Sequence, residues 1–166
     1  MIYIIDGNNL AGQLGILFQN DFDKNLIEVI KKYFCTKKMK VYLVFDSNEP
    51  MGDKFSEGFI EIIYTPRDTF YQSADDKVLE LVAREIDLGA GNNQISVVTD
   101  DLDLIEAVEK AARKRNYSLV IIKARDFAEK IKNKNIQDKI IIEDRGIDKE
   151  QEEKINRELL KIWREK

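Results

Sequence analysis

Acidic residues stand at several points where this sequence could do chemistry. The residues concerned are Asp6, Asp75, Asp76, Asp100, Asp101 and Asp103. Each group either follows an apolar, strand-like run or opens a helical pattern. Because ligands of open α/β sheets bind outside the carboxyl ends of the strands, these side chains are expected to converge on one pocket. Carboxylates about 4 Å apart repel by about 4 kcal/mol at an effective dielectric of about 20, and a divalent cation would offset that repulsion.

The 166-residue sequence contains no histidine, and this narrows the chemistry further. It excludes Ser–His and Cys–His nucleophilic pairs, histidine-ligated zinc and acid–base catalysis by histidine. Carboxylates, lysines, hydroxyls and oxygen-bound metals remain. Hard oxygen ligands favour Mg²⁺ or Mn²⁺. Cys35 is the lone cysteine, and its aromatic neighbours indicate a buried thiol in a reducing compartment.

Length and composition limit the number of domains and the kinds of partner that this protein can have. The length suits one domain, and no apolar run is long enough to cross a membrane, so we expect a soluble, cytoplasmic protein without membrane association. The formal net charge is −4. That charge opposes binding of nucleic acid through a broad basic face, and any contact with a polyanion is expected to be local.

The elements that would position the acids follow a regular alternation. Strand-like runs rich in β-branched and aromatic residues occupy 2–5, 41–45, 59–64, 95–99 and 119–123. Apolar residues at helical spacing lie between them, at 26–34, 78–86 and 104–112. This alternation predicts an α/β fold with a buried, open parallel sheet. The connection 46–58 carries Pro50, Gly52 and Gly58 and is predicted to be a mobile loop.

The C-terminal part contains two further candidate elements. Residues 140–142 are three isoleucines and are compatible with a sixth, edge strand, and 149–166 form a charged helical run with a narrow apolar stripe. We expect this run to pack on the domain, with docking of a partner as the alternative. The expected organisation is a domain over residues 1–135 and an extension over 136–166.

Each acidic segment also has an ordinary interpretation. Asp6 begins the segment Asp-Gly-Asn-Asn, whose residue types are those of an ordinary turn. Ser73 with Asp76 fits a capping box, which leaves Asp75 unexplained. The segment 100–103 fits a helix cap followed by first-turn acids, but three acids within four residues exceed what capping requires. Only the conjunction of the segments argues for a site.

Three segments together resemble the NYN domains, which are relatives of the PIN-domain nucleases. The opening Asp-Gly-Asn-Asn at 6–9 is similar to the Asp-Gly-x-Asn opening of that family. The segments Ser-Ala-Asp-Asp-Lys-Val-Leu at 73–79 and Val-Val-Thr-Asp-Asp at 97–101 resemble the later motifs of its YacP-like RNase branch. The resemblance covers about residues 1–130, and its specificity lies in the combination and order of the motifs.

The resemblance implies a fold, an activity and a substrate. The fold would be PIN-like, with a sheet of order 3-2-1-4-5 in the numbering of the five predicted strands and helices on both faces. The activity would be Mg²⁺- or Mn²⁺-dependent endonucleolytic hydrolysis of single-stranded RNA, with messenger RNA as a candidate. A ribonucleoprotein or a second copy of the chain is a candidate partner.

Motif matching also implies roles for individual residues. The metal ligands would be Asp6, Asp75, Asp101 and Asp103, and Asn9 would orient Asp6 or the phosphate. Further candidates for the site are Asp76, Asp100 and Thr99, and the choice between Asp100 and Asp101 stays open. Candidates for contact with the RNA backbone are Arg67, Lys77 and Lys54, because they flank the pocket in sequence or lie in the loop before it.

Two other functions compete with the nuclease. A receiver-like phospho-signalling domain also has an acidic pocket at the carboxyl edge of a parallel sheet and a lysine after its fifth strand, where Lys123 stands. It requires an acid at the end of the third strand, which here ends at Tyr64 and Thr65. The second alternative is a non-catalytic RNA-binding protein that keeps the PIN-like fold.

Overall fold

A computed structural model describes residues 1–34, 39–47, 52–66, 73–89 and 94–144. The elements are β1 (Ile2–Asp6), α1 (Gly7–Leu14), α2 (Phe22–Phe34), β2 (Lys40–Asp46), β3 (Asp53–Glu57), β4 (Ile60–Thr65), α3 (Ala74–Asp87), β5 (Ile95–Val98), α4 (Leu102–Arg113), β6 (Val120–Ile122) and α5 (Ala124–Asp144). The chain divides into two compact units, Met1–Lys130 and Ile131–Lys166. The sheet and the acidic residues lie in the first.

The described strands form one sheet in the order β3-β4-β2-β1-β5-β6. Every described strand pair is parallel except β3 and β4, which are antiparallel. The expected five-strand order lacked β3, and the prediction of a loop over its residues was wrong. Its side chains are mostly exposed, so they show no apolar alternation. Gly58, with φ of 64°, makes the tight turn that pairs β3 with β4.

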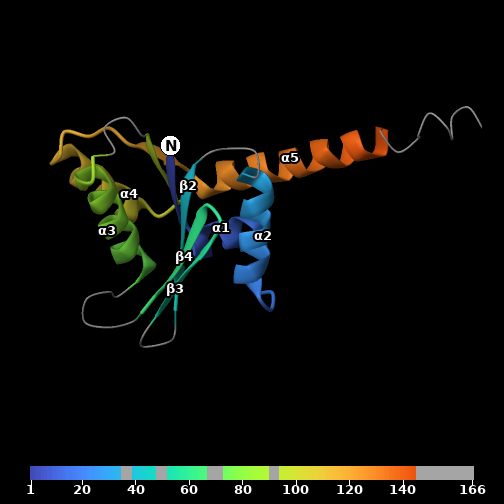
Figure 1. The fold of residues 1–166 in the computed structure, drawn as a ribbon, viewed down its shortest axis with the longest axis horizontal. Coiled ribbons are helices and arrows are strands. Elements are labelled where there is room, and N and C mark those ends of the chain that lie inside the picture. The colour runs from blue at the N-terminus through green and yellow to red at the C-terminus, as the bar shows by residue number, and fades with distance from the viewer. Residues whose placement is uncertain (35–38, 48–51, 67–72, 90–93, 145–166) are drawn as a thin grey trace, which may run out of the picture. The chain divides into compact units, whose positions relative to one another are not determined.

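Helices cover both faces of the sheet in the first unit, with α3 and α4 on one face and α1 and α2 on the other (Figure 1). The core beneath α3 and α4 is built from apolar side chains of both layers, among them Ile4, Val44, Val78, Leu81, Val97 and Val108. On the opposite face the Phe34 ring packs on Tyr3, with 4.9 Å between ring centroids. Burial from both sides explains why the central strands are mostly apolar, with charged residues only where β1 and β2 begin or end.

The three isoleucines at 140–142 lie within α5, so the edge strand considered for them is wrong. No glycine or proline stands between Ala124 and Asp144, which agrees with one continuous helix over this range. The predicted charged helix over 149–166 lies outside the described residues. Among the described helices, none combines the length and the apolar character that crossing a bilayer requires.

Candidate functional site

Asp6 is the most buried acid at the carboxyl edge of the sheet, with 7% of its surface exposed. It ends β1 and caps α1, where its Oδ1 accepts a hydrogen bond from the Asn9 backbone N–H at 3.0 Å. Burial is the main cause that raises the pKa of Asp6 to about 6, and the charges of Asp75 and Asp46 add to it. Hydrogen bonds from Asn9 and Thr99 oppose this rise.

Thr99 and Asn9 join the end of β1 to the segment that follows β5. The fully buried Thr99 hydroxyl donates to Asp6 Oδ2 at 3.3 Å and accepts from the Asp101 N–H at 3.1 Å. The Asn9 side-chain Oδ1 accepts from the Asp100 N–H at 3.3 Å. Two polar side chains therefore fix the separation of the segments that carry Asp6 and Asp101.

The three acids after β5 point to different partners. Asp101 caps α4, since its Oδ1 accepts from the N–H groups of Asp103 at 2.8 Å and Leu104 at 3.0 Å. The Asp100 Oδ2 accepts from the Arg125 N–H at 3.2 Å and so is directed to the start of α5. Asp103 is exposed in the first turn of α4. The helix cap considered for segment 100–103 is thus present, and Asp101 makes it. The charge of Asp101 also helps to raise the pKa of Asp75.

Asp75 is half-buried in the first turn of α3 and lies within electrostatic reach of several acids. Burial is the largest cause of its raised pKa, followed by the charges of Asp101, Asp46 and Asp76. A hydrogen bond from the Ser73 side chain lowers the pKa in part. Asp75 is thus electrostatically coupled to Asp6 and to Asp101, and through it the three acids form one acidic cluster.

The capping box expected from Ser73 is wrong, because the Ser73 side chain makes no cap hydrogen bond. Asp46, at the end of β2, caps α3 instead: its Oδ1 accepts from the Ala74 N–H at 2.8 Å. Its Oδ2 accepts from the Asn8 Nδ2 at 3.1 Å. Sequence reasoning did not include Asp46 in the site, although it follows an apolar run just as Asp6 does.

Helix N-termini surround this cluster of acids. Of the described helices, α1, α3, α4 and α5 each donate at least one N–H of their first turn to a carboxylate, respectively from Asp6, Asp46, Asp101 and Asp100. The positive end of a helix dipole stabilises a nearby anion by about 0.3–1 kcal/mol. These helices therefore offset part of the repulsion among the carboxylates.

The model of one protein family, the YacP-like NYN domain, matches residues 3–166. The chain belongs to this family. The resemblance inferred from the motifs is thereby confirmed. NYN domains belong to the PIN-like nuclease superfamily, whose members generally depend on a divalent metal. Comparison with curated proteins gave no match, and neither did comparison with solved structures.

The donor atoms of this NYN domain suit a hard divalent cation. Carboxylate oxygens are the preferred ligands of Mg²⁺ and Mn²⁺. Burial is the main cause of the raised pKa of Asp6 and of Asp75, and the charges of neighbouring carboxylates add to it, so negative charge gathers here. Within the described residues, no three carboxylates are already grouped closely enough to hold a metal ion. The site therefore suits a divalent cation in the type of its donor atoms and in its negative charge.

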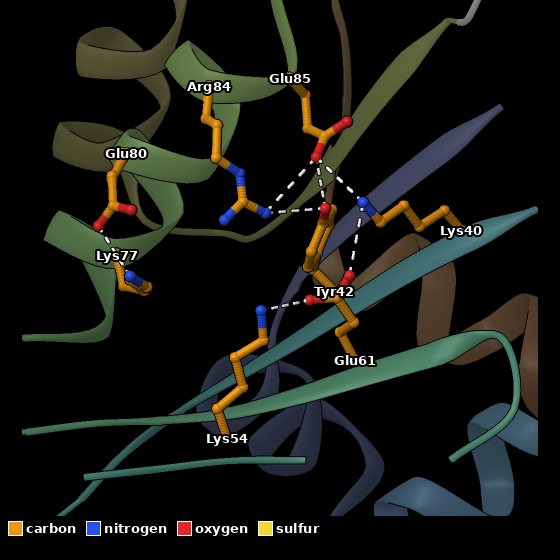
Figure 2. Close-up of polar contacts among 8 residues, drawn as sticks. All are labelled: Lys40, Tyr42, Lys54, Glu61, Lys77, Glu80, Arg84 and Glu85. Carbon is orange, nitrogen blue, oxygen red and sulfur yellow. Dashed lines mark hydrogen bonds and ion pairs between the residues drawn. The ribbon is translucent and has the colours of Figure 1, made fainter. Parts of the chain in front are cut away.

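Two of the basic residues expected to contact RNA are engaged with carboxylates (Figure 2). The Lys54 ammonium lies 2.7 Å from Glu61 Oε2, and the Lys77 ammonium lies 2.8 Å from Glu80 Oε2. Arg67 lies outside the described residues. Contact of Lys54 or Lys77 with RNA would compete with these ion pairs.

Figure 2 also shows how the other end of α3 is held. The buried Tyr42 hydroxyl of β2 donates to Glu85 of α3 and accepts from Arg84 Nη2 at 2.8 Å. The Lys40 ammonium lies 3.2 Å from the same Glu85 oxygen. This polar cluster ties α3 to β2 near the C-terminus of the helix, while Asp46 ties its N-terminus, and Asp75 is thereby fixed in position.

Proposed function

We propose that this NYN domain is a metal-dependent endoribonuclease that hydrolyses single-stranded RNA. The observation that carries the proposal is the electrostatic coupling of Asp75 to both Asp6 and Asp101, since the three acids come from separate segments of the chain. Like charges brought together at the carboxyl edge of a sheet are costly and are typical of a functional site. Membership in a nuclease superfamily supports the same reaction.

In this proposal Asp6, Asp75 and Asp101 hold Mg²⁺ or Mn²⁺. Asp103, exposed in the first turn of α4 two residues after Asp101, is the fourth candidate ligand. A divalent cation bound there would supply a water of lowered pKa and neutralise charge on the scissile phosphate. This chemistry requires no histidine, in agreement with the composition.

The other polar residues orient the ligands. The Thr99 hydroxyl donates a hydrogen bond to Asp6 Oδ2 and so helps to fix the orientation of that carboxylate. Asn9 contributes its backbone N–H to Asp6 and its side-chain oxygen to the segment after β5. Asp46 places Asp75 by holding the first turn of α3. Asp76 and Asp100 contribute negative charge at the rim.

Hydrolysis by water determines the product ends. The water oxygen bonds to phosphorus, its proton passes to solvent, and the 3′-oxygen leaves with its bonding electrons and takes up a proton. The products carry a 5′-phosphate and a 3′-hydroxyl. Attack by the 2′-hydroxyl would instead leave a cyclic phosphate, so the ends distinguish the two reactions.

The test is cleavage of an end-labelled single-stranded RNA with Mn²⁺, with Mg²⁺ and with chelator, followed by analysis of the ends. We expect metal-dependent fragments with a 5′-phosphate, loss of cleavage in Asp6→Asn, and full cleavage in Glu106→Gln. Glu106 is an exposed residue of α4, so that variant loses the same charge on the surface. Equal cleavage of matched single-stranded DNA would contradict RNA as the substrate.

Binding of RNA without cleavage under any metal condition would favour a non-catalytic RNA-binding protein. A receiver-like function would instead show as phosphorylation by a small phosphodonor. The third of the predicted strands, β4, ends at Thr65 with no acid at the position that such phosphotransfer needs.

A further inference from the structure

The junction of β6 and α5 is hydrogen-bonded to the acidic cluster. The Thr99 N–H donates to the Ile122 carbonyl at 3.2 Å. The Arg125 N–H donates to Asp100 Oδ2 at 3.2 Å, and the Asp100 N–H donates in turn to Asn9 Oδ1. The backbone around Lys123 and Arg125 is therefore held beside the segments that carry Asp6 and Asp101.

Both basic side chains of this junction are open to solvent. The Lys123 side chain is exposed, and its ammonium makes no hydrogen bond or ion pair within the part of the chain that the structure describes. The Arg125 side chain is 62% exposed, and its carboxylate partner is Asp126, 3.7 Å away in a surface pair. Such pairs contribute little to stability, so both cations are available to a ligand.

The acidic character of the protein makes local cations necessary for a polyanionic substrate. The net charge is −4, and the helix N–H groups described above already donate to carboxylates. Those N–H groups are therefore not free to bind phosphate, as the N-terminus of a helix otherwise can. Lys54 and Lys77 are held by Glu61 and Glu80. Arginine binds phosphate through two parallel hydrogen bonds and lysine through a point charge.

We propose that Lys123 and Arg125 bind the phosphate backbone of the single-stranded RNA to one side of the cleaved bond. This inference rests on the proposed function. It adds the surface over which the RNA strand would run on one side of the acidic cluster. The contact is to backbone phosphates, so it carries no base specificity.

The test compares the double variant Lys123→Ala/Arg125→Ala with Lys110→Ala/Lys114→Ala. The control pair is exposed at the C-terminal end of α4 and removes the same charge. The affinity for a short single-stranded RNA is measured in chelator over a range of salt concentrations. For single strands, a plot of the logarithm of the binding constant against the logarithm of salt concentration has a negative slope, whose magnitude is about 0.7 per phosphate contact. We therefore expect the magnitude of the slope to decrease by about 1.4 in the first variant, which would lose two contacts. The control should keep the wild-type slope.

Cleavage with Mn²⁺ provides a second readout. Loss of a contact that is equal in the ground and transition states raises KM and leaves kcat unchanged. The inference is overturned if the first variant keeps the wild-type slope and KM, if the control pair loses as much, or if the wild-type protein binds no RNA. Failure of the proposed function looks different: the wild-type protein would cleave no RNA with any metal, while the difference in salt slope between the two variants would persist.

Discussion

At the scale of single residues, Asp46 has the clearest structural task, because its two oxygens bind the starts of α1 and α3. Asp46→Ala leaves the Ala74 N–H without its acceptor, and loss of a helix cap costs about 0.5–2 kcal/mol. We also expect lower cleavage, since Asp75 follows Ala74 directly. Asp46→Asn keeps an oxygen that can accept from Ala74 and should retain more stability than Asp46→Ala.

Ser73→Ala is the matched control for this prediction. The Ser73 side chain does not cap α3, so its removal should change the free energy of unfolding less than Asp46→Ala does. Urea denaturation of the three variants in chelator measures these differences. If Ser73→Ala were the more costly change, the cap would come from Ser73 and not from Asp46.

Asp6 should make stability depend on pH. Its pKa rises from 3.8 to about 6 on folding, so the native state holds the proton more tightly than the unfolded chain does. The stabilisation that protonated Asp6 gives the folded state is therefore fully present below about pH 4 and is lost as the pH rises past about 6. The loss in the free energy of unfolding is about 3 kcal/mol. In chelator, wild-type protein should lose stability relative to Asp6→Asn across this window. Parallel stability curves for the two proteins would show that the pKa of Asp6 is not raised.

At the scale of elements, burial decides which parts could be predicted from the sequence. The strands β1, β2 and β5 are buried on both faces, and their apolar runs identify them. The edge strand β3 is exposed, so its residues Asp-Lys-Phe-Ser-Glu carry no such pattern. The local composition of residues 100–103 also indicated a helix cap, which the structure places at Asp101. The cap of α3 comes from Asp46, far away in the chain, and no local pattern could reveal it.

The start of α1 depends on a close approach of backbone to β2. A Cβ added at Gly7 would lie 2.5 Å from the Phe45 ring and 2.8 Å from the Val44 carbonyl oxygen. Gly7→Ala should therefore displace α1 and Asp6 from β2. We expect it to lower the free energy of unfolding by about 1–3 kcal/mol and to reduce RNA cleavage. Gly12 is the control, because its added Cβ would meet nothing nearer than 3.9 Å.

Gly12→Ala should be neutral or stabilising by about 0.5–1 kcal/mol, since alanine is favoured over glycine inside a helix. Thermal melting and RNA cleavage of both variants provide the comparison. Equal behaviour of Gly7→Ala and Gly12→Ala would mean that the contact of Gly7 with β2 does not position the site.

At the scale of the whole molecule, negative charge is concentrated at one edge of the sheet in a protein that is acidic overall. Helix N-termini and hydrogen bonds hold the carboxylates in place. The charges of neighbouring acids nevertheless add to the rise in the pKa of Asp6 and of Asp75 that burial mainly causes. The site therefore retains unbalanced repulsion. A divalent cation that enters it should bind the folded state and stabilise the whole domain.

We accordingly expect millimolar Mg²⁺ or Mn²⁺ to raise the melting temperature of the wild-type protein. A ligand that binds only the folded state stabilises it by about 2.7 kcal/mol at a hundredfold excess over its Kd. Asp75→Asn should be as stable as wild type or more so in chelator, because it removes a like charge, yet gain little from metal. Asp76→Asn is the control: this neighbour is exposed and should keep the metal-dependent shift. If Asp75→Asn keeps the metal-dependent rise in melting temperature and Asp76→Asn loses it, the metal ligand is Asp76 and not Asp75. If metal does not raise the melting temperature of the wild-type protein, there is no metal site among these acids.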